Sequence, residues 1–476
     1  MEKSTQRANT TGHERSFTSM LDQALTEIVY GISDTASRQS YYRSQSSIDL
    51  AHLVMLDKRQ LVQRDAVRAL GRTIVELRET DFEALLHVPS PRGAFVAYEE
   101  FLIDKLGSDV GGRLHTARSR NDLNATISSM SVRSAWLKIL ETTAQTVEVL
   151  ERKADEYADA PFPAFTHAQP AMPSTFGAYL ANVGVSVALI GRQVATMERY
   201  FDSCPLGACA GYGTSIPIDP EITAHLLGYT QGPLGSIAAV ADRSAASLVL
   251  GQLAELSTLY SRVAADLQFW SSGAVGLVYF PDNLVGQSSI MPQKRNAFVL
   301  ENIKARCASI IAAHMESLVS MKSAPYTNTI EVSSEAISGF SVAVEGYRGI
   351  ATLVDWHLDG AVPQMDIARQ VMRQGNVGAT FEAEQAVMRD GVAFREAYNS
   401  VRTKMQMPSA SRSVGESSQA VEPAEFGAGP SAVQTRRICN RLGEYREELS
   451  STLEKVRGRV DKSAANLRKE VEELLR

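Results

Sequence analysis

The sequence predicts an all-α protein built as a bundle of long helices. Apolar residues recur at helical spacing through long segments, which is the pattern of helices with a buried face. Alternating runs bounded by hairpin turns, which would indicate strands, are scarce. A chain of 476 residues with 44% hydrophobic content can bury a large core and form two or three domains. The clearest apolar series are Leu253, Leu256, Leu259 or Tyr260, Val263 and Leu267, then Val299, Ile303, Cys307, Ile310 and Ile311.

The composition narrows the class of protein further. The net charge is −6 and no long basic run occurs, so nucleic acid is not an expected partner. The polar start of the chain and the lack of 18 consecutive apolar residues predict no membrane association and a cytoplasmic location. The histidines and the four cysteines lack the spacings of metal sites, and nucleotide-binding glycine motifs are missing, so no cofactor or metal is expected. The cysteines are expected to be small buried residues.

Gly, Pro and Ser gather in a few stretches that we expect to connect the helices. These stretches lie near 109–121, 161–176, 204–221 and 281–297. Residues that converge on a small polar substrate are usually carried by such loops on a rigid scaffold. A further segment, 407–433, is Ser-rich and reads as a surface linker before a charged helix from about 434 to 476. Residues 1–17 are expected to be disordered.

The stretch from Gly286 to Asn296 has the composition of a mobile anion-binding loop. It carries two serines, Lys294 and Asn296 just before a helix expected to begin near Ala297. A lysine, an amide donor and a helix N-terminus all favour a carboxylate that gains charge during a reaction. An ordinary surface loop with a helix cap is the alternative on these residues alone.

Two other loops carry groups that suit the same kind of substrate. The segment His115–Asp122 places two arginines among short polar side chains, and arginine binds carboxylates bidentately. The segment Phe165–Pro170 places His167 beside Thr166 in a turn bounded by proline. Histidine carries protons near neutral pH, although a lone histidine is more often structural.

Together these loops resemble the signature regions of the argininosuccinate lyase family in the fumarase/aspartase superfamily. HTARSRND is similar to the family's HTGRSRND, THAQPAMPSTFG to THxQxAQPxTFG, and SSIMPQKRN to SSxMPxKxN. The likeness extends to Pro205–Gly207 with Pro217–Asp219, to Asp242-Arg243, to Trp270–Ser272 and to Gly391–Ala397, and so covers about 45–400. Three motifs in the family's order make coincidence improbable.

The resemblance implies a carbon–nitrogen lyase that removes an amine from an N-substituted aspartate and releases fumarate, or catalyses the reverse addition. Ser288 matches the catalytic base, which needs Lys294 and backbone donors to stabilise its deprotonated form. Lys294 and Asn296 match carboxylate-binding positions, and Glu301 matches the glutamate that orients His167. The matching substrate contacts are Thr166, Ser119, Arg120 and Asn121. Arg118 and Asp122 are expected to hold their loop in shape.

The same resemblance implies three helical domains and a homotetramer. The expected domains are 1–117, 118–366 with the long helices, and 367–476. Each active site would combine loops from three subunits, so that His167 and Ser288 meet from different chains.

The chain departs from the family mainly at the amine half of the site. Tyr326 matches a tyrosine that contacts the tail of argininosuccinate, but Glu331 and Ser334 stand where the family has glutamine and lysine. A carboxylate in place of a lysine disfavours an anionic tail. The N-terminal WGGRF motif is missing, Gln287 replaces the glycine before the serine pair, and Met172 and Leu123 replace glutamines.

These departures leave several functions open. A lyase for a different N-substituted aspartate competes with argininosuccinate lyase itself. A bulk structural protein of the crystallin type is a third possibility, opposed by the retained site residues. A cycloisomerase of the carboxymuconate type is a fourth, which HTARSRND disfavours.

Overall fold

The computed structural model describes residues 35–86, 88, 93–406 and 423–476 and confirms the all-α class. The chain forms two compact units. Of the described residues, unit 1 comprises those within 1–127, 203–239 and 462–476, and unit 2 those within 128–202 and 240–461. The disorder expected for 1–17 lies outside the described residues, as does the 407–422 part of the expected linker.

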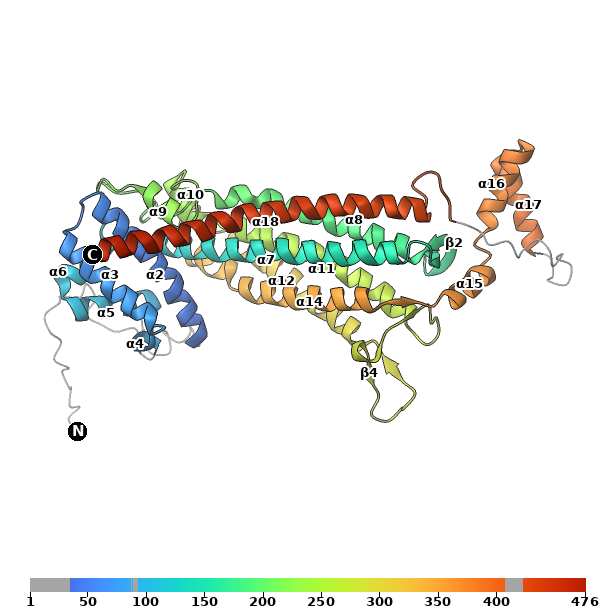
Figure 1. Ribbon diagram of the computed structural model, residues 1–476, viewed down its shortest axis with the longest axis horizontal. Helices are drawn as coiled ribbons and strands as arrows, with labels where there is room; N and C mark the ends of the chain where they lie inside the picture. The colour runs from blue at the N-terminus through green and yellow to red at the C-terminus, as the bar shows by residue number, and fades with distance from the viewer. Residues whose placement is uncertain (1–34, 87, 89–92, 407–422) are drawn as a thin grey trace. The chain divides into compact units, whose positions relative to one another are not determined.

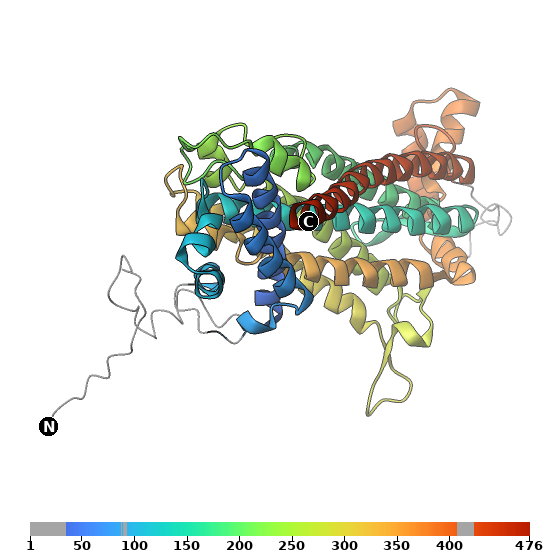
Figure 2. The ribbon, with the colours of Figure 1, turned by 60° about the vertical axis from the view of Figure 1, so that its left-hand side comes forward.

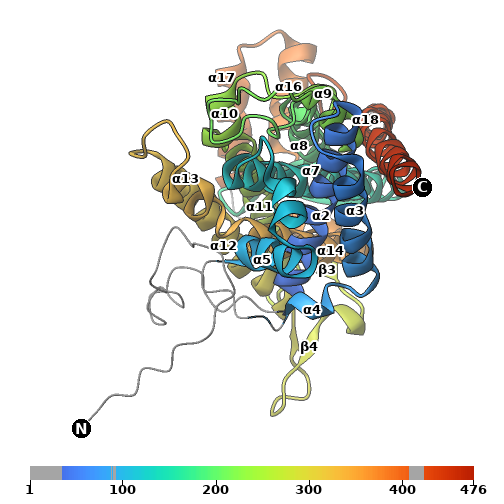
Figure 3. The same ribbon diagram turned by 90° about the vertical axis from the view of Figure 1, so that its left-hand side faces the viewer.

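Unit 1 consists of helices of varied length, from four to 24 residues, together with parts of longer helices. They are α2 (Thr35–Lys58), α3 (Arg64–Glu79), α4 (Glu83–Leu86), α5 (Ala94–Leu106), α6 (Ser108–Gly111), the 3₁₀ helix η1 (Gly112–His115), α9 (Pro220–Leu226), most of α10 (Ser236–Ala241), the first residues of α7 (Arg120–Glu156) and the last of α18 (Ala432–Leu475). Helices α3 and α5 pack on α2 (Figure 3). The Tyr42 ring lies 5.8 Å from that of Tyr98 and 5.7 Å from that of Phe82, and these aromatics form the centre of the core.

Unit 2 is a bundle of long helices with small two-stranded sheets at its loops (Figures 1 and 2). Its elements are most of α7 and α18, β1 (Pro161–Thr166), β2 (Gln169–Thr175), α8 (Phe176–Ala195), η2 (Thr196–Phe201), α11 (Ser244–Trp270), β3 (Val278–Tyr279), η3 (Asp282–Leu284), β4 (Gly286–Gln287), β5 (Arg295–Asn296), α12 (Phe298–Met321), α13 (Ile330–Ser333), η4 (Glu335–Ile337), α14 (Phe340–Gly360), β6 (Val362–Pro363), α15 (Met365–Gln374), α16 (Ala379–Asp390) and α17 (Phe394–Gln406). The charged helix expected from about residue 434 is confirmed as α18.

The apolar series read from the sequence correspond to buried faces of α11 and α12, except at Val299, which is only partly buried next to the buried Leu300, and at Ile311. Leu253 and Leu256 on α11 and Ile303 on α12 are buried in one continuous core. Ile311 was expected in the same core, but its side chain is 38% exposed. It follows Ile310 directly, so it is rotated about 100° away from the buried stripe. The four cysteines are free and buried, as expected.

Helix α8 approaches its neighbours closely because small residues recur along one face. Gly177, Gly184 and Gly191 are seven residues apart. A Cβ on Gly177 would lie 2.3 Å from the Ala154 carbonyl oxygen of α7, and one on Gly184 would lie 2.6 Å from the Leu442 side chain of α18. The stretch 176–201 is the one helical segment of the described chain that is long and apolar enough to cross a membrane, and core helices of bundles share this property.

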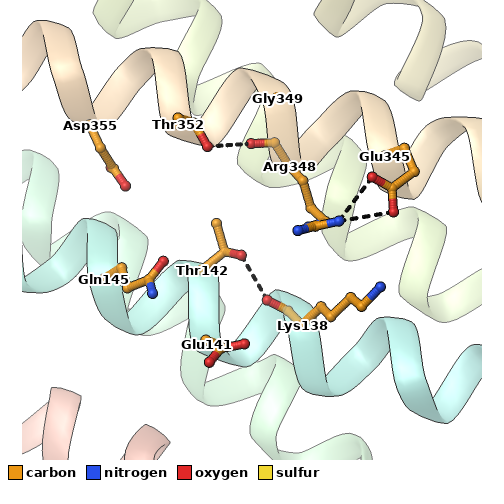
Figure 4. Close-up of a pocket in the computed structure, with 9 residues that line it drawn as sticks. All are labelled: Lys138, Glu141, Thr142, Gln145, Glu345, Arg348, Gly349, Thr352 and Asp355. Carbon is orange, nitrogen blue, oxygen red and sulfur yellow. Dashed lines mark hydrogen bonds and ion pairs between the residues drawn. The ribbon is translucent and has the colours of Figure 1, made fainter.

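A polar groove of about 460 Å³ lies between α7 and α14 (Figure 4). The Asp355 carboxylate accepts a hydrogen bond of 2.7 Å from the Thr146 hydroxyl. Burial raises the pKa of Asp355 to about 7, although this hydrogen bond opposes the rise. The remaining lining residues are Lys138, Glu141, Thr142, Gln145, Glu345, Arg348, Gly349 and Thr352.

Asp355 makes the stability of the bundle depend on pH. Its pKa rises on folding from an ordinary value near 3.8 to about 7, so the folded state binds the extra proton between these values. Stability conferred by that proton is present at pH 4 and is lost as the pH rises through 7. At pH 8 we expect the free energy of unfolding of Asp355→Asn to exceed that of the wild type by on the order of 2–4 kcal/mol, which is measured as a higher urea midpoint. At pH 4.5 the two midpoints should be nearly equal. Equal differences at both pH values would contradict this account.

Candidate active site

The β1–β2 hairpin presents Thr166 and His167 at its tip. Thr166 pairs with Gln169, and the two residues between them, His167 and Ala168, have φ angles of 53° and 60°. Two successive positive φ angles define a type I′ turn, which closes a tight hairpin. Thr166 and His167 are both exposed. The expected turn is therefore confirmed, and it holds the histidine outward on a rigid support.

The loop with the serine pair is the tip of a second hairpin, whose stem is β4 and β5. Arg295 anchors the stem: it donates to the Phe280 carbonyl oxygen at 2.6 Å, pairs with Asp282 and lies over the Tyr279 ring. Gly286 is needed here because a Cβ would lie 2.8 Å from the Phe298 ring. The expected start of the following helix is confirmed, since α12 begins at Phe298.

Within this tip, Ser288 and Ser289 have different surroundings. The Ser288 Oγ accepts hydrogen bonds from the amides of Met291 at 3.1 Å and Ile290 at 3.4 Å. Ser289 is exposed, whereas Ser288 is half-buried. Two amides aimed at one hydroxyl oxygen favour its alkoxide, because each N–H stabilises negative charge at that atom. The backbone donors expected beside Ser288 are thus present.

The other charged residues of this region lie on the same hairpin and helix. Lys294, at the end of the tip, is exposed, and Asn296 in β5 is half-buried. Glu301 lies in the first turn of α12 and accepts a hydrogen bond of 2.9 Å from the Gln268 side-chain Nε2. Lys304 donates to the Gln268 side-chain Oε1, so the Gln268 side chain has a fixed orientation. No sequence pattern had pointed to Gln268.

In unit 1 the segment Ser119–Asp122 forms the capped start of α7. The Asn121 amide donates to the Ser119 hydroxyl at 3.2 Å, and the Ser119 amide donates to the Asp122 carboxylate at 3.0 Å. This reciprocal pattern is a capping box. The Asn121 side chain donates to the Ala210 carbonyl oxygen at 3.3 Å, while Arg120 is exposed. Arg120 therefore projects outward from a helix N-terminus, where an anionic group is favoured.

Arg118 and Asp122 are confirmed as residues that hold this loop. Asp122 also accepts the amides of Gly207 at 3.0 Å and Cys209 at 2.9 Å, which ties the loop after Pro205 to the start of α7. Burial raises the pKa of Asp122, and these amides oppose the rise. Arg118 forms a buried ion pair with Asp49. The family likeness around Pro205–Gly207 pointed to the loop that Asp122 contacts, whereas no feature of the sequence pointed to Asp49.

The residues expected at the amine half lie between α12 and η4. Tyr326 is 69% exposed, and Glu331 and Ser334 are exposed on and just after α13. The Ser334 hydroxyl donates to the Ile330 carbonyl oxygen at 3.1 Å. The backbone amide of Glu331 itself is the main cause that lowers the pKa of this carboxyl, which is therefore ionised at neutral pH.

Two of the expected groups lie on separate hairpins of unit 2. The β1–β2 hairpin and the β4–β5 hairpin stand apart in Figure 1. None of the predicted site residues lines the polar groove of α7 and α14. Over the part of the chain that the structure describes, no group of three or more His, Cys, Asp or Glu residues is arranged to hold a metal ion.

Comparisons with known proteins agree with the fold and the motifs. A family profile described as lyase matches residues 61–312. An argininosuccinate lyase of Bartonella bacilliformis is 31% identical over 76% of this chain and 77% of its own, and argininosuccinate lyase 1 of Shouchella clausii is 28% identical over 80% and 76%. A crystal structure of EDDS lyase in complex with formate has a TM-score of 0.82 at 20% identity, covering 94% of this chain and 95% of its own. The matched residues 61–312 include the Ser119–Asn121 segment, the Thr166–His167 turn and the serine loop, and the chain belongs to the argininosuccinate lyase family of the fumarase/aspartase superfamily.

Proposed function

We propose that this protein is a carbon–nitrogen lyase that releases fumarate from an N-substituted aspartate by β-elimination. The observation that carries the proposal is the environment of Ser288, whose Oγ accepts two backbone amides in a hairpin tip that ends at Lys294. An alkoxide that is stabilised in this way can remove a proton from the carbon next to a carboxylate. The family membership supports the same chemistry.

In this proposal each residue has a defined task. Ser288 removes the proton, and the resulting aci-carboxylate carries two negative charges that Lys294 and Asn296 stabilise. The carbon–nitrogen bond then breaks and the amine leaves, with His167 assisting its protonation and Glu301 orienting the histidine. The second carboxylate group of the aspartate portion binds to Ser119, Arg120, Asn121 and Thr166.

We propose that the amine half differs from that of argininosuccinate. Tyr326 contacts the amine portion, and the ionised Glu331 favours an amine that is cationic or neutral at its far end. Argininosuccinate carries a carboxylate there, which Glu331 repels, and Ser334 supplies no compensating positive charge. A lyase for another N-substituted aspartate therefore fits these residues better than argininosuccinate lyase itself. A catalytically silent crystallin-like protein is opposed by the donor arrangement around Ser288.

We further propose a homotetramer in which three chains contribute to each site and the domains are 1–117, 118–366 and 367–476. The separation of the two hairpins in one chain supports shared sites (Figure 1). Large apolar side chains exposed on three bundle helices support helix packing between subunits, since such surfaces mark interfaces. They are Phe298, Ile311, Met315, Leu318 and Val319 on α12, Leu248 on α11, and Val342 and Trp356 on α14. A cytoplasmic location stays a prediction.

The assignment of Ser288 is tested by replacing each serine of the pair. We expect Ser288→Ala to lower kcat at least 100-fold or so, because a positioned base contributes about that much or more. Ser289→Ala, the matched control, should retain most of the activity. Both are assayed by the absorbance of released fumarate with a panel of N-substituted aspartates. A fully active Ser288→Ala would overturn the assignment.

Shared sites are tested by complementation. His167→Asn and Ser288→Ala are each expected to be inactive, but after subunit exchange some sites should contain both native residues. We expect activity to return in the mixture and not in either variant exchanged with itself. Exchange is followed by native mass spectrometry with one variant isotopically labelled. Demonstrated exchange without activity would count against sites built from several chains.

The amine preference is tested with a double substitution toward the family pattern. We expect Glu331→Gln with Ser334→Lys to raise kcat/KM for argininosuccinate several-fold, because a repulsive charge is replaced by an attractive one. Glu335→Gln removes a neighbouring exposed carboxylate and serves as the control. A wild type that already cleaves argininosuccinate efficiently, or a double variant without gain, would return argininosuccinate to first place.

A further inference from the structure

In the loop before α7, Ala117 has a strained backbone at a position where the family motif has glycine. Ala117 has a φ angle of +54°, in the left-handed region that favours glycine. HTGRSRND, the motif that this segment resembles, has glycine where this chain has Ala117. A side chain in this conformation persists only when neighbouring contacts hold it in place.

Helix α2 supplies such contacts on both sides of Ala117. His52 donates from Nε2 to the Thr116 carbonyl oxygen at 2.9 Å, and Asp49 pairs with the Arg118 guanidinium. Asp49 and His52 are three residues apart and therefore share one face of α2. Burial lowers the pKa of His52 to about 3, so its ring is neutral and acts as a fixed donor at neutral pH.

The Asp49–Arg118 pair is fully withdrawn from water, with side-chain exposures of 0% and 2%. Burial raises the pKa of Asp49, and the adjacent Arg118 guanidinium opposes that rise. Buried ion pairs contribute little to net stability, because desolvation offsets the attraction and apolar replacements are often as stable. Such a pair can instead fix the orientation of a segment. Arg118 directly precedes Ser119, so holding the Arg118 guanidinium also holds the backbone at the start of the capping box.

We propose that Asp49, assisted by His52, is a positioning residue of the lyase site: it holds the Ala117 turn through Arg118 and so places Ser119, Arg120 and Asn121 for the substrate carboxylate. This inference rests on the proposed function. Asp49 touches no substrate in this account and acts only through Arg118. A loss of positioning therefore weakens carboxylate binding and leaves the base Ser288 intact.

The test replaces the ion pair by apolar residues, as Asp49→Leu with Arg118→Met. Neither member of the pair is then left without the other, the Asp122 carboxylate keeps its three backbone amide donors, and we expect the unfolding midpoint to stay within about 5 °C of the wild type. We expect KM for the best N-substituted aspartate to rise about tenfold with kcat reduced less than about threefold, because the lost interaction acts in binding. Adding Ala117→Gly should recover part of the KM, since glycine adopts the turn without an anchor.

Two controls separate positioning from stability and from the proposed function. Ile74→Ala opens a cavity in the unit 1 core and leaves both charges of the pair in place, so it should lower the unfolding midpoint without raising KM. Hydrogen exchange of the Thr116–Asp122 amides should be faster in the apolar double variant. If the wild type is active and the double variant has an unchanged KM, the positioning role of Asp49 is overturned while the proposed function stands. A wild type that neither turns over any substrate nor binds fumarate by calorimetry would overturn the proposed function and this role with it.

Discussion

The carboxylate of Asp122 is the contact on which the arrangement of the site most depends. It closes the capping box at the first turn of α7 and accepts two further amides from the loop after Pro205. Helix α7 runs on as far as Glu156, so the helix that this carboxylate caps is also one of the long helices of unit 2. One buried side chain thus ties two loops to the start of a core helix.

The helical class and the loops were predictable because both depend on patterns of neighbouring residues in the sequence. Period-3.6 apolar residues such as Leu253 and Ile303 are buried, and the segment with Ser288 and Lys294 stops where α12 begins. Ile311 was misplaced because two adjacent apolar residues leave open which of them faces inward. Only packing decides this, and α12 exposes that side of the helix.

Contacts between distant residues were beyond the reach of such patterns. Asp49 lies 69 residues before Arg118, and nothing local distinguishes it from any other helical carboxylate. Gln268 is equally ordinary in sequence, yet it orients Glu301. The resemblance locates residues that lie within the motifs. The contacts that hold those residues come from elements outside the motifs, as the α2 side chains on either side of Ala117 illustrate.

The anchored stem of the β4–β5 hairpin has a consequence for how strongly product is held. Arg295 and Phe298 fix the two ends of the tip, while Ser289 to Lys294 lie exposed. Each tip residue that becomes fixed when a dianion is enclosed costs about 1–2 kcal/mol of backbone entropy. In the proposed reaction, the cost of ordering the tip offsets part of the attraction between Lys294 and fumarate. Under that proposal the product is held less tightly than its charges alone would suggest, which favours its departure after each turnover.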